Sequence, residues 1–302
     1  MSIQAHQTAP TQFTYATAVT QYVQAGATRF AYRRMGRERG VPLLFMQNFR
    51  QSMDSVDPLL LDGFGQDRPV IIFDNAGVSS SGGQTPDTIE AMADDVASFV
   101  GALELPQVDV LGFSIGGYTA IAFTLRHPRL VRRLLLVGTA PRGQEPRTDP
   151  RVDQIVSRPV LGLEEHLLVL FSPSQASQAT GRAFWARQQA GWEQRRQRGL
   201  DLDPLTSQQT AKAQYAAILE WRQIKGERFA ELRTIKQPTL VVNGSNDIMV
   251  PTINSWTMSQ HIPNAQLIVY PDAGHAAHYQ YPELFLNHSK LFLDSPLQVA
   301  RN

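Results

Sequence analysis

Cysteine is absent from this chain of 302 residues, and neither sign of charge is in clear excess. Without a thiol, the chain has no disulfide, no thiolate nucleophile and no thiolate metal site. Lysine and arginine number 28 against 27 aspartates and glutamates, which gives a formal net charge of +1. A nucleic-acid-binding protein usually carries a basic surface. We therefore expect no nucleic-acid partner.

Long apolar runs are also missing. No run approaches the roughly 18 residues that a helix needs to cross a bilayer, so we expect no membrane association. Residues 1–20 are polar and lack the basic and apolar regions of a signal peptide. We interpret them as a flexible lead-in and expect a cytoplasmic protein. The hydrophobic content of 42% is enough for a large core and excludes a disordered or fibrous chain.

Short apolar runs alternate with helical patterns through most of the chain. The runs at Val41–Asn48 and Arg68–Gly77 indicate buried strands, and so do the segments QVDVLGF, LVRRLLLVGTAP, QPTLVVNGSND and AQLIVYPDAGH. Helical spacing lies between several of these runs. The alternation predicts βαβ units and a mostly parallel sheet.

One long segment has a different texture. From residue 141 to residue 233 the strand-like runs stop, and helical patterns appear at 163–170, 174–198 and 206–225. We interpret this segment as a helical insertion into a continuous α/β core. The core is then made of residues 21–140 and 234–302.

A tight turn inside the segment VDVLGFSIGGY carries the strongest chemical signal. It contains a G-x-S-x-G match from Gly112 to Gly116, with an apolar strand directly before it and a helix directly after it. A serine at the tip of such a turn needs small neighbours, because side chains two positions away would collide with the strand and the helix. Ser114 would then face the amides of a helix N-terminus, which stabilise an oxyanion.

A serine nucleophile needs a base, and the base needs an orienting acid. His275 follows Gly274 at the exit of a predicted strand, and Asp247 lies just past the end of another. Because the carboxyl ends of parallel strands meet at one edge of a sheet, both would face Ser114. His278 competes with His275 as the base, and Asp272 competes with Asp247 as the acid. Neither cysteine nor an H-E-x-x-H pattern is present, so we expect no metal.

On these residues the chain resembles the α/β-hydrolase superfamily. The segments FDNAGVSSSGG, LGFSIGGYTA and YPDAGHAAHYQYPELF look like those of small esterases, lactonases and cofactor-independent haloperoxidases. The resemblance implies a mostly parallel eight-stranded sheet flanked by helices, with a helical cap after the sixth strand. It also implies a catalytic triad of Ser114, Asp247 and His275 and no cofactor.

The oxyanion loop departs from the usual family pattern. Gln47 and Asn48 stand where many members have His-Gly after the third strand. The resemblance implies that the backbone N–H groups of Phe49 and Ile115 bind the oxyanion. The side chains of Gln47 and Asn48 either add a donor to the substrate pocket or hydrogen-bond the loop itself.

Several further side chains are candidates for the substrate pocket. Arg50 would meet a substrate carboxylate or, alternatively, form a structural salt bridge. Packing inside the cap or core is the alternative for the others. The candidates for the pocket wall are Phe113, Trp185, Trp192, Trp221 and His278.

We expect a serine hydrolase that cleaves a carboxylic ester or lactone of a small to mid-sized apolar substrate through an acyl-serine. The same triad would also suit carbon–carbon bond hydrolysis, or perhydrolysis as in a haloperoxidase. A ligand-binding receptor that kept the fold is the alternative from another class. The expected partner is a small-molecule substrate, and a homodimer is an open possibility.

Overall fold

The computed structural model describes residues 13–158 and 161–296, so residues 1–12 of the expected lead-in lie outside the described residues. One sheet has the strand order β1-β2-β4-β3-β5-β6-β7-β8. Strands β3 to β8 run parallel to their neighbours in this order, whereas β2 is antiparallel to β1 and β4. The mostly parallel eight-stranded sheet is therefore confirmed. The strands are β1 (Gln21–Ala25), β2 (Thr28–Gly36), β3 (Leu43–Met46), β4 (Pro69–Phe73), β5 (Val108–Phe113), β6 (Val131–Val137), β7 (Thr239–Gly244) and β8 (Ala265–Tyr270).

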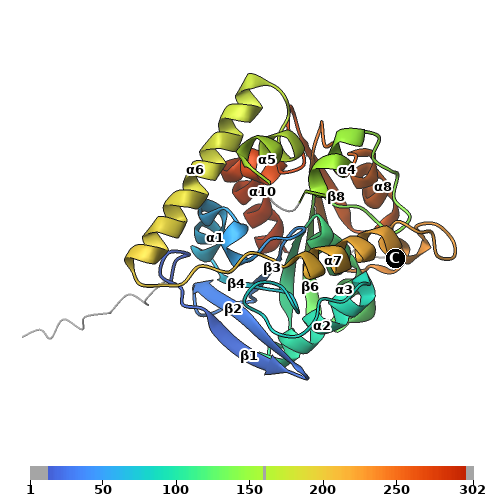
Figure 1. Cartoon of the computed structure of the whole chain (residues 1–302). Helices are drawn as coiled ribbons and strands as arrows, with labels where there is room; N and C mark the ends of the chain where they lie inside the picture. The colour runs from blue at the N-terminus through green and yellow to red at the C-terminus, as the bar shows by residue number, and fades with distance from the viewer. Residues whose placement is uncertain (1–12, 159–160, 297–302) are drawn as a thin grey trace, which may run out of the picture.

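Helices cover both faces of this sheet (Figure 1). Strands β3, β4, β5 and β7 are buried along their whole length, as expected for parallel strands between two helical layers. Side chains alternate between two apolar clusters: Leu43 and Phe45 belong to one, and Leu44 and Met46 to the other. Each fully buried aliphatic side chain contributes about 1.5–3 kcal/mol relative to an exposed one.

The core helices divide between the two faces. On one face α1 (Pro58–Gly65) packs against α10 (Pro282–Asp294), next to the short α9 (Ala277–Gln280). On the other face α2 (Ile89–Ala102) packs against α3 (Ile115–Arg126), and α8 (Ile253–His261) contacts β7 and β8. No helix among the described residues is long and apolar enough to cross a membrane.

The segment between β6 and β7 is helical. It contains α4 (Pro150–Val156), α5 (Leu163–Leu170), α6 (Gln175–Gln197) and α7 (Gln208–Trp221). The last three lie within the three predicted helical ranges. The sequence interpretation missed α4, a short helix that begins with Asp149 as N-cap and Pro150 in its first turn. Helix α6 runs beside α1, and α7 lies against α2, so the inserted helices contact both helical layers (Figure 1).

Candidate active site

The turn between β5 and α3 has the geometry that its glycines allow. Ser114 lies at φ 56° and ψ −121°, a strained backbone conformation for a residue with a side chain. A Cβ on Gly112 would lie 2.5 Å from the Gly116 carbonyl oxygen, and one on Gly116 would collide with the Met46 carbonyl. The strain is held in place by the surrounding backbone: the Ser114 amide donates to Val137 at 3.0 Å.

Asp247 and His275 form a hydrogen-bonded pair at the same edge of the sheet. The Nδ1 atom of His275 lies 2.8 Å from Oδ2 of Asp247, and both side chains are essentially buried. The other oxygen of Asp247 accepts the amides of Met249 and Val250 at 2.8 and 2.9 Å. These bonds fix the carboxylate, so it holds the imidazole in one orientation with Nδ1 carrying the proton.

The opposite nitrogen of His275 is buried, and Nε2 has no hydrogen-bond partner among the described residues. The ring lies beside the residue that precedes the serine, with 4.9 Å between the centroids of the His275 and Phe113 rings. It also lies against Gly138, where a Cβ would be 3.2 Å from Nδ1. The structure thus brings His275 and Asp247 to the same corner as the Ser114 turn.

The competing residues have other contacts. Asp272 accepts a hydrogen bond from the hydroxyl of Ser174 at 2.5 Å, and its carbonyl oxygen accepts Nε2 of Gln280 at 2.7 Å. It therefore shapes the loop before His275 and does not contact the ring. The loop is further tied to the inserted helices, because the Ala276 amide donates to the carbonyl of Leu170 at the end of α5.

The loop after β3 brings Phe49 to the same edge. Within the described residues, neither the Phe49 amide nor the Ile115 amide donates one of the main-chain hydrogen bonds of the turns and loops. The sharp turn falls at Arg50, which has φ 62°, rather than at the position where the family usually has glycine. Asn48 supports this turn by accepting the amide of Gln51 on its carbonyl oxygen at 3.3 Å.

Two buried polar side chains in this corner lack hydrogen-bond partners. Gln47 is 2% exposed, and neither of its amide atoms has a partner among the described residues. His278 is fully buried at the start of α9, with its ring centroid 4.4 Å from that of Phe113. Both of its nitrogens are unpaired in the described part of the chain. Burial lowers the pKa of His278 well below its ordinary value, and the neighbouring His275 adds to this shift, so His278 is neutral at physiological pH.

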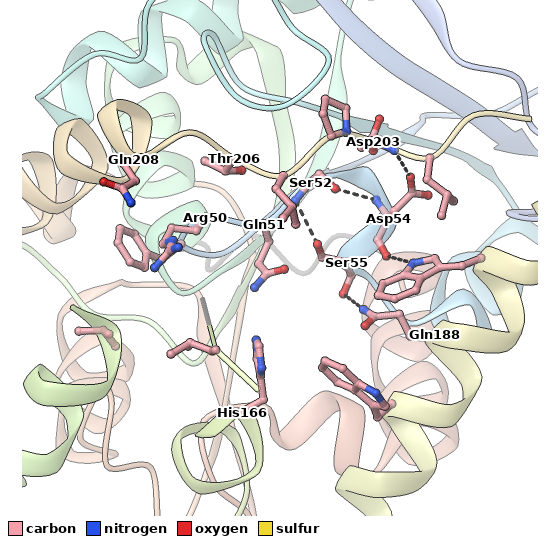
Figure 2. Close-up of a pocket in the computed structure, with 18 of the residues that line it drawn as sticks. Arg50, Gln51, Ser52, Asp54, Ser55, His166, Gln188, Asp203, Thr206 and Gln208 are labelled. Carbon is pink, nitrogen blue, oxygen red and sulfur yellow. Dashed lines mark hydrogen bonds between the residues drawn. The ribbon is translucent and has the colours of Figure 1, made fainter. Parts of the chain in front are cut away.

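A cavity of about 610 Å³ lies between the β3 loop and the inserted helices. Figure 2 shows Arg50, Gln51 and Ser52 on one side of it and His166 on the other, with Gln188 of α6 bonded to the carbonyl of Ser55. Of the residues expected in the pocket wall, Arg50, Trp185 and Trp192 line this cavity, and Phe49 does so as well. Ser114, Asp247 and His275 are not among the lining residues, and Phe49 is the residue that the cavity shares with the expected oxyanion site.

Arg50 connects the β3 loop to the inserted helices. Its backbone amide donates to Oε1 of Gln214 in α7 at 2.8 Å, and its Nη1 donates to the carbonyl of Arg158 at 2.6 Å. Burial lowers the pKa of the guanidinium. The structure therefore gives Arg50 a bridging role at the cavity rim.

Trp221 corrects one expectation. It is 1% exposed and absent from the cavity wall, because it packs on the core helix α3. Its ring stacks on Tyr118 with 5.9 Å between centroids, and its Nε1 donates to the carbonyl of Ala140 at 3.2 Å. Gln47, Asn48, Phe113 and His278 also fall outside the lining of this cavity.

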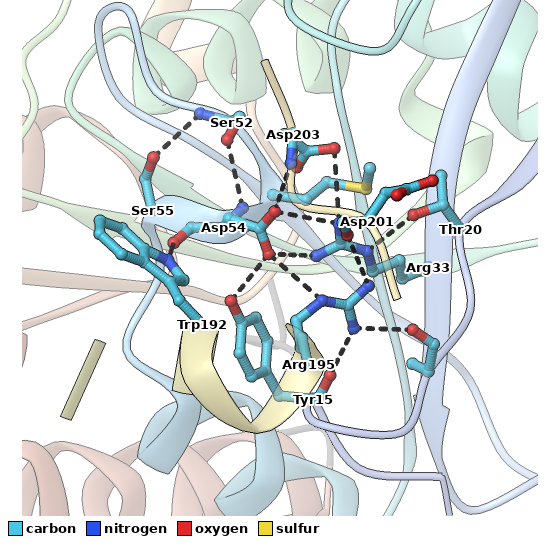
Figure 3. A network of polar contacts seen from close by, with 12 residues as sticks. Tyr15, Thr20, Arg33, Ser52, Asp54, Ser55, Trp192, Arg195, Asp201 and Asp203 are labelled. Carbon is cyan, nitrogen blue, oxygen red and sulfur yellow. Dashed lines mark hydrogen bonds and ion pairs between the residues drawn. The ribbon is translucent and has the colours of Figure 1, made fainter. Parts of the chain in front are cut away.

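Sequence reasoning missed a buried charge network (Figure 3), of which Asp54 and Asp203 also line the cavity. Asp54 accepts Nη1 of Arg33 at 2.5 Å and the hydroxyl of Tyr15 at 2.7 Å. Its second oxygen accepts the amide of Asp203 at 2.7 Å, and Arg195 from α6 approaches to 3.6 Å. These residues come from distant parts of the chain, so no local sequence motif predicts that they meet.

Burial alone would raise the pKa of Asp54, but the Arg33 guanidinium outweighs it and holds this pKa below its ordinary value. The carboxylate is therefore charged, and the network joins the core to the inserted helix α6 by an ion pair. No group of three or more metal-ligating side chains was found in the described ranges 13–158 and 161–296.

The fold and the corner at Ser114 define the class of the protein. The chain belongs to the alpha/beta hydrolase fold family, whose model matches residues 42–282. A solved alpha/beta hydrolase fold protein from Chitinophaga pinensis is 36% identical, with a TM-score of 0.85. The alignment covers 94% of this chain and 100% of that one.

Two curated relatives indicate the range of chemistry among similar proteins. A pimeloyl-[acyl-carrier protein] methyl ester esterase of Nitrosomonas europaea is 30% identical over 206 residues, which cover 67% of this chain and 75% of the relative. A 2-hydroxymuconate semialdehyde hydrolase of Pseudomonas putida is 31% identical over 202 residues, covering 64% of each chain. The similar proteins are hydrolases, and an esterase is among them.

Proposed function

We propose that this protein is a serine hydrolase that cleaves a carboxylic ester or lactone through an acyl-serine. The observation that carries the proposal is the His275 ring, which is held by Asp247 through Nδ1 while its buried Nε2 is left without a partner beside the Ser114 turn. A general base must keep one nitrogen available for the proton it removes. This arrangement is the one that a nucleophilic serine requires.

In the proposed mechanism the Oγ of Ser114 attacks the substrate carbonyl carbon while Nε2 of His275 takes its proton. The amides of Phe49 and Ile115 bind the oxyanion of the tetrahedral intermediate. The intermediate collapses to the acyl-serine, and the alcohol leaves with the proton from His275. Water, deprotonated by the same nitrogen, then releases the acid and restores Ser114.

The cavity supports a substrate of small to medium size. Its volume of about 610 Å³ falls within the roughly 300–1,000 Å³ typical of small-molecule sites. Phe49 links it to the proposed oxyanion site, because this residue belongs to both. Two tryptophans, Trp185 and Trp192, give its wall a large apolar surface.

Substitution of the serine tests the proposal. We expect Ser114→Ala to lower kcat on p-nitrophenyl butyrate about 10⁴-fold, the scale seen when a triad member is removed. A fluorophosphonate probe should label the wild-type protein at Ser114 and leave the variant unlabelled. Retained turnover in Ser114→Ala would contradict the proposed serine mechanism. A wild-type protein that the probe does not label would contradict it too and would favour a ligand-binding protein instead.

Hydrolysis of a carbon–carbon bond by the same triad is the second candidate, favoured by the similarity to the 2-hydroxymuconate semialdehyde hydrolase. A substrate panel separates the two. Turnover of vinylogous diketones at least 100-fold above that of all alkyl esters would replace the ester assignment. Parallel assays with peroxide and a carboxylic acid test for perhydrolysis.

A further inference from the structure

Gln47 differs from the other buried glutamine near this corner. Gln280 is 7% exposed, yet its Nε2 donates to Asp272 and its Oε1 accepts the hydroxyl of Ser177, both at 2.7 Å. Gln47 is 2% exposed, and both amide atoms are without a partner among the described residues. A buried amide left unpaired costs free energy, so native proteins rarely keep one without a reason.

The position of Gln47 in the fold gives that reason. Strand β3 pairs with β5 in parallel, and Met46 lies opposite Gly112. One step further along the ladder, Gln47 is level with Phe113, the residue before Ser114. The Gln47 carbonyl oxygen is 2.6 Å from where a Gly116 Cβ would be, so its backbone touches the serine turn.

The direction of the side chain follows from the pleat of the strand. Successive residues alternate between faces, so Gln47 continues the face of Phe45. Phe45 and Phe113 belong to the same apolar cluster, and the ring of Phe113 lies 4.9 Å from that of His275. The carboxamide of Gln47 therefore belongs to the corner formed by the serine turn and the histidine.

We propose that Gln47 is a specificity-determining residue whose carboxamide binds a polar group of the substrate next to the scissile carbonyl. The proposal rests on the function proposed above. Hydrogen bonds within the loop, the alternative use of this side chain, are not formed among the described residues. A substrate group that displaces water from the carboxamide would satisfy both amide atoms when the site is in use.

The two unpaired atoms define the chemistry of that group. A plain alkyl ester offers only acceptors, so it satisfies Nε2 and leaves Oε1 unpaired. A hydroxyl is both a donor and an acceptor and matches the carboxamide. The substrate class is thus an ester or lactone with a hydroxyl on its acyl part, near the reacting carbonyl. A site built for such a group discriminates strongly against the analogue that lacks it.

The test compares matched esters in matched variants. Methyl butyrate is assayed against methyl 2-hydroxybutyrate and methyl 3-hydroxybutyrate, with wild type, Gln47→Met and Gln280→Met. We expect wild type to prefer one hydroxy ester at least about tenfold in kcat/KM. Gln47→Met, which keeps the length of the side chain, should lose this preference through a fall of about 10- to 100-fold on the hydroxy ester.

Urea unfolding of the same variants separates substrate binding from a structural role. Gln47→Met breaks no hydrogen bond of the described structure, so its unfolding midpoint should equal or exceed that of wild type. Gln280→Met loses two hydrogen bonds and should unfold at lower urea while keeping the ratio between the esters. The proposal is overturned if wild type shows no preference for either hydroxy ester, if Gln47→Met keeps that preference, or if Gln47→Met is destabilised as much as Gln280→Met.

Failure of this inference is distinguishable from failure of the proposed function. If Ser114→Ala still hydrolyses these esters, the serine mechanism is wrong. If Ser114→Ala is inactive while Gln47→Met behaves like wild type on all three esters, the mechanism stands and only the role of Gln47 is refuted.

Discussion

Two buried carboxylates in this protein have opposite surroundings. Asp54 is bonded to a guanidinium, a tyrosine hydroxyl and a backbone amide, with a second arginine close by. Asp247 is bonded to two amides and one imidazole, and the far nitrogen of that imidazole has no partner among the described residues. In the first group, which we call the closed network, each charge faces an opposite charge. The second, which we call the open chain, ends in an imidazole nitrogen that has no partner among the described residues.

We interpret the first group as a structural ion pair and the second as the reactive pair of the proposed mechanism. Around Asp54 the charges neutralise each other, and the bonds join β2, the η1 turn (Met53–Ser55) and α6. A network of paired charges of this kind holds elements together, although Nε of Arg195 and one oxygen of Asp203 form no hydrogen bond among the described residues. Around Asp247 the polar groups are fewer and form a chain with one free end. The feature that distinguishes the second group is an unpaired imidazole nitrogen held by a fixed carboxylate beside the Ser114 turn.

The largest predicted effect tests the open chain. We expect Asp247→Asn to lower kcat on p-nitrophenyl butyrate about 10⁴-fold, because an amide no longer holds the His275 tautomer or stabilises its charged form. Stopped-flow or steady-state rates measure the change. Asp272→Asn is the matched control, since Asp272 lies in the same loop as His275 but contacts Ser174. A similar loss in both variants would mean that the loop, and not the carboxylate–imidazole pair, governs activity.

The next effect tests the closed network. Asp54→Asn removes the carboxylate that faces both Arg33 and Arg195, and it leaves Arg33 with Asp203 at 3.4 Å. We expect a loss of about 3–5 kcal/mol in the free energy of unfolding. Urea denaturation measures it. Glu164→Gln is the control, because Glu164 and Arg182 form an exposed pair, and exposed pairs contribute little to stability. Equal stability losses in the two variants would show that the Asp54 network is not structural.

The folded Asp54→Asn protein should also keep kcat within about tenfold of wild type, far from the loss expected for a triad residue. A loss comparable to that of Asp247→Asn would remove the distinction between the two carboxylates. Activity and stability measured on both Asp54→Asn and Asp247→Asn thus test whether one carboxylate supports folding and the other supports turnover.

The residues of the Ser114 corner could be predicted from the sequence, whereas those of the Asp54 network could not. Ser114, Asp247 and His275 each follow a strand, and parallel strands end at one edge of the sheet, so their meeting followed from the strand pattern. The fold class followed from the same alternation of strands and helices. Residues such as Tyr15, Arg33 and Arg195 lie in unrelated elements without a shared spacing, and only the packing of α6 on the core brings them together.

The pocket was predicted only in part, for a related reason. Trp185 and Trp192 reach the cavity, whereas Trp221 turns toward Tyr118 in the core. All three lie in helical segments of the insertion, and the sequence does not reveal which face of each helix meets which layer. The low hydrophobic contrast of a glutamine- and arginine-rich helix such as α6 leaves that choice to tertiary packing.

The smallest predicted effect concerns the stability contribution of His278, the second histidine beside Phe113. Its nitrogens have no partner in the described structure, and burial holds its pKa well below the ordinary value of 6.5. Below about pH 6.5, His278 therefore binds a proton in the unfolded chain but stays neutral in the folded protein. Folding stability must fall as the pH drops through this range, by up to about 1.4 kcal/mol per pH unit.

In His278→Leu this contribution disappears, so the stability of wild type relative to the variant should decline steadily from pH 7 to pH 5. The half-buried His166, whose pKa is also lowered by desolvation, is present in both proteins and cancels in the difference. Urea midpoints at half-unit pH steps measure the decline. A difference between the two proteins that stays constant over this range would mean that His278 accepts a proton in the folded state as readily as in the unfolded one. His275 would then not be the one histidine in this corner with a nitrogen available to a proton.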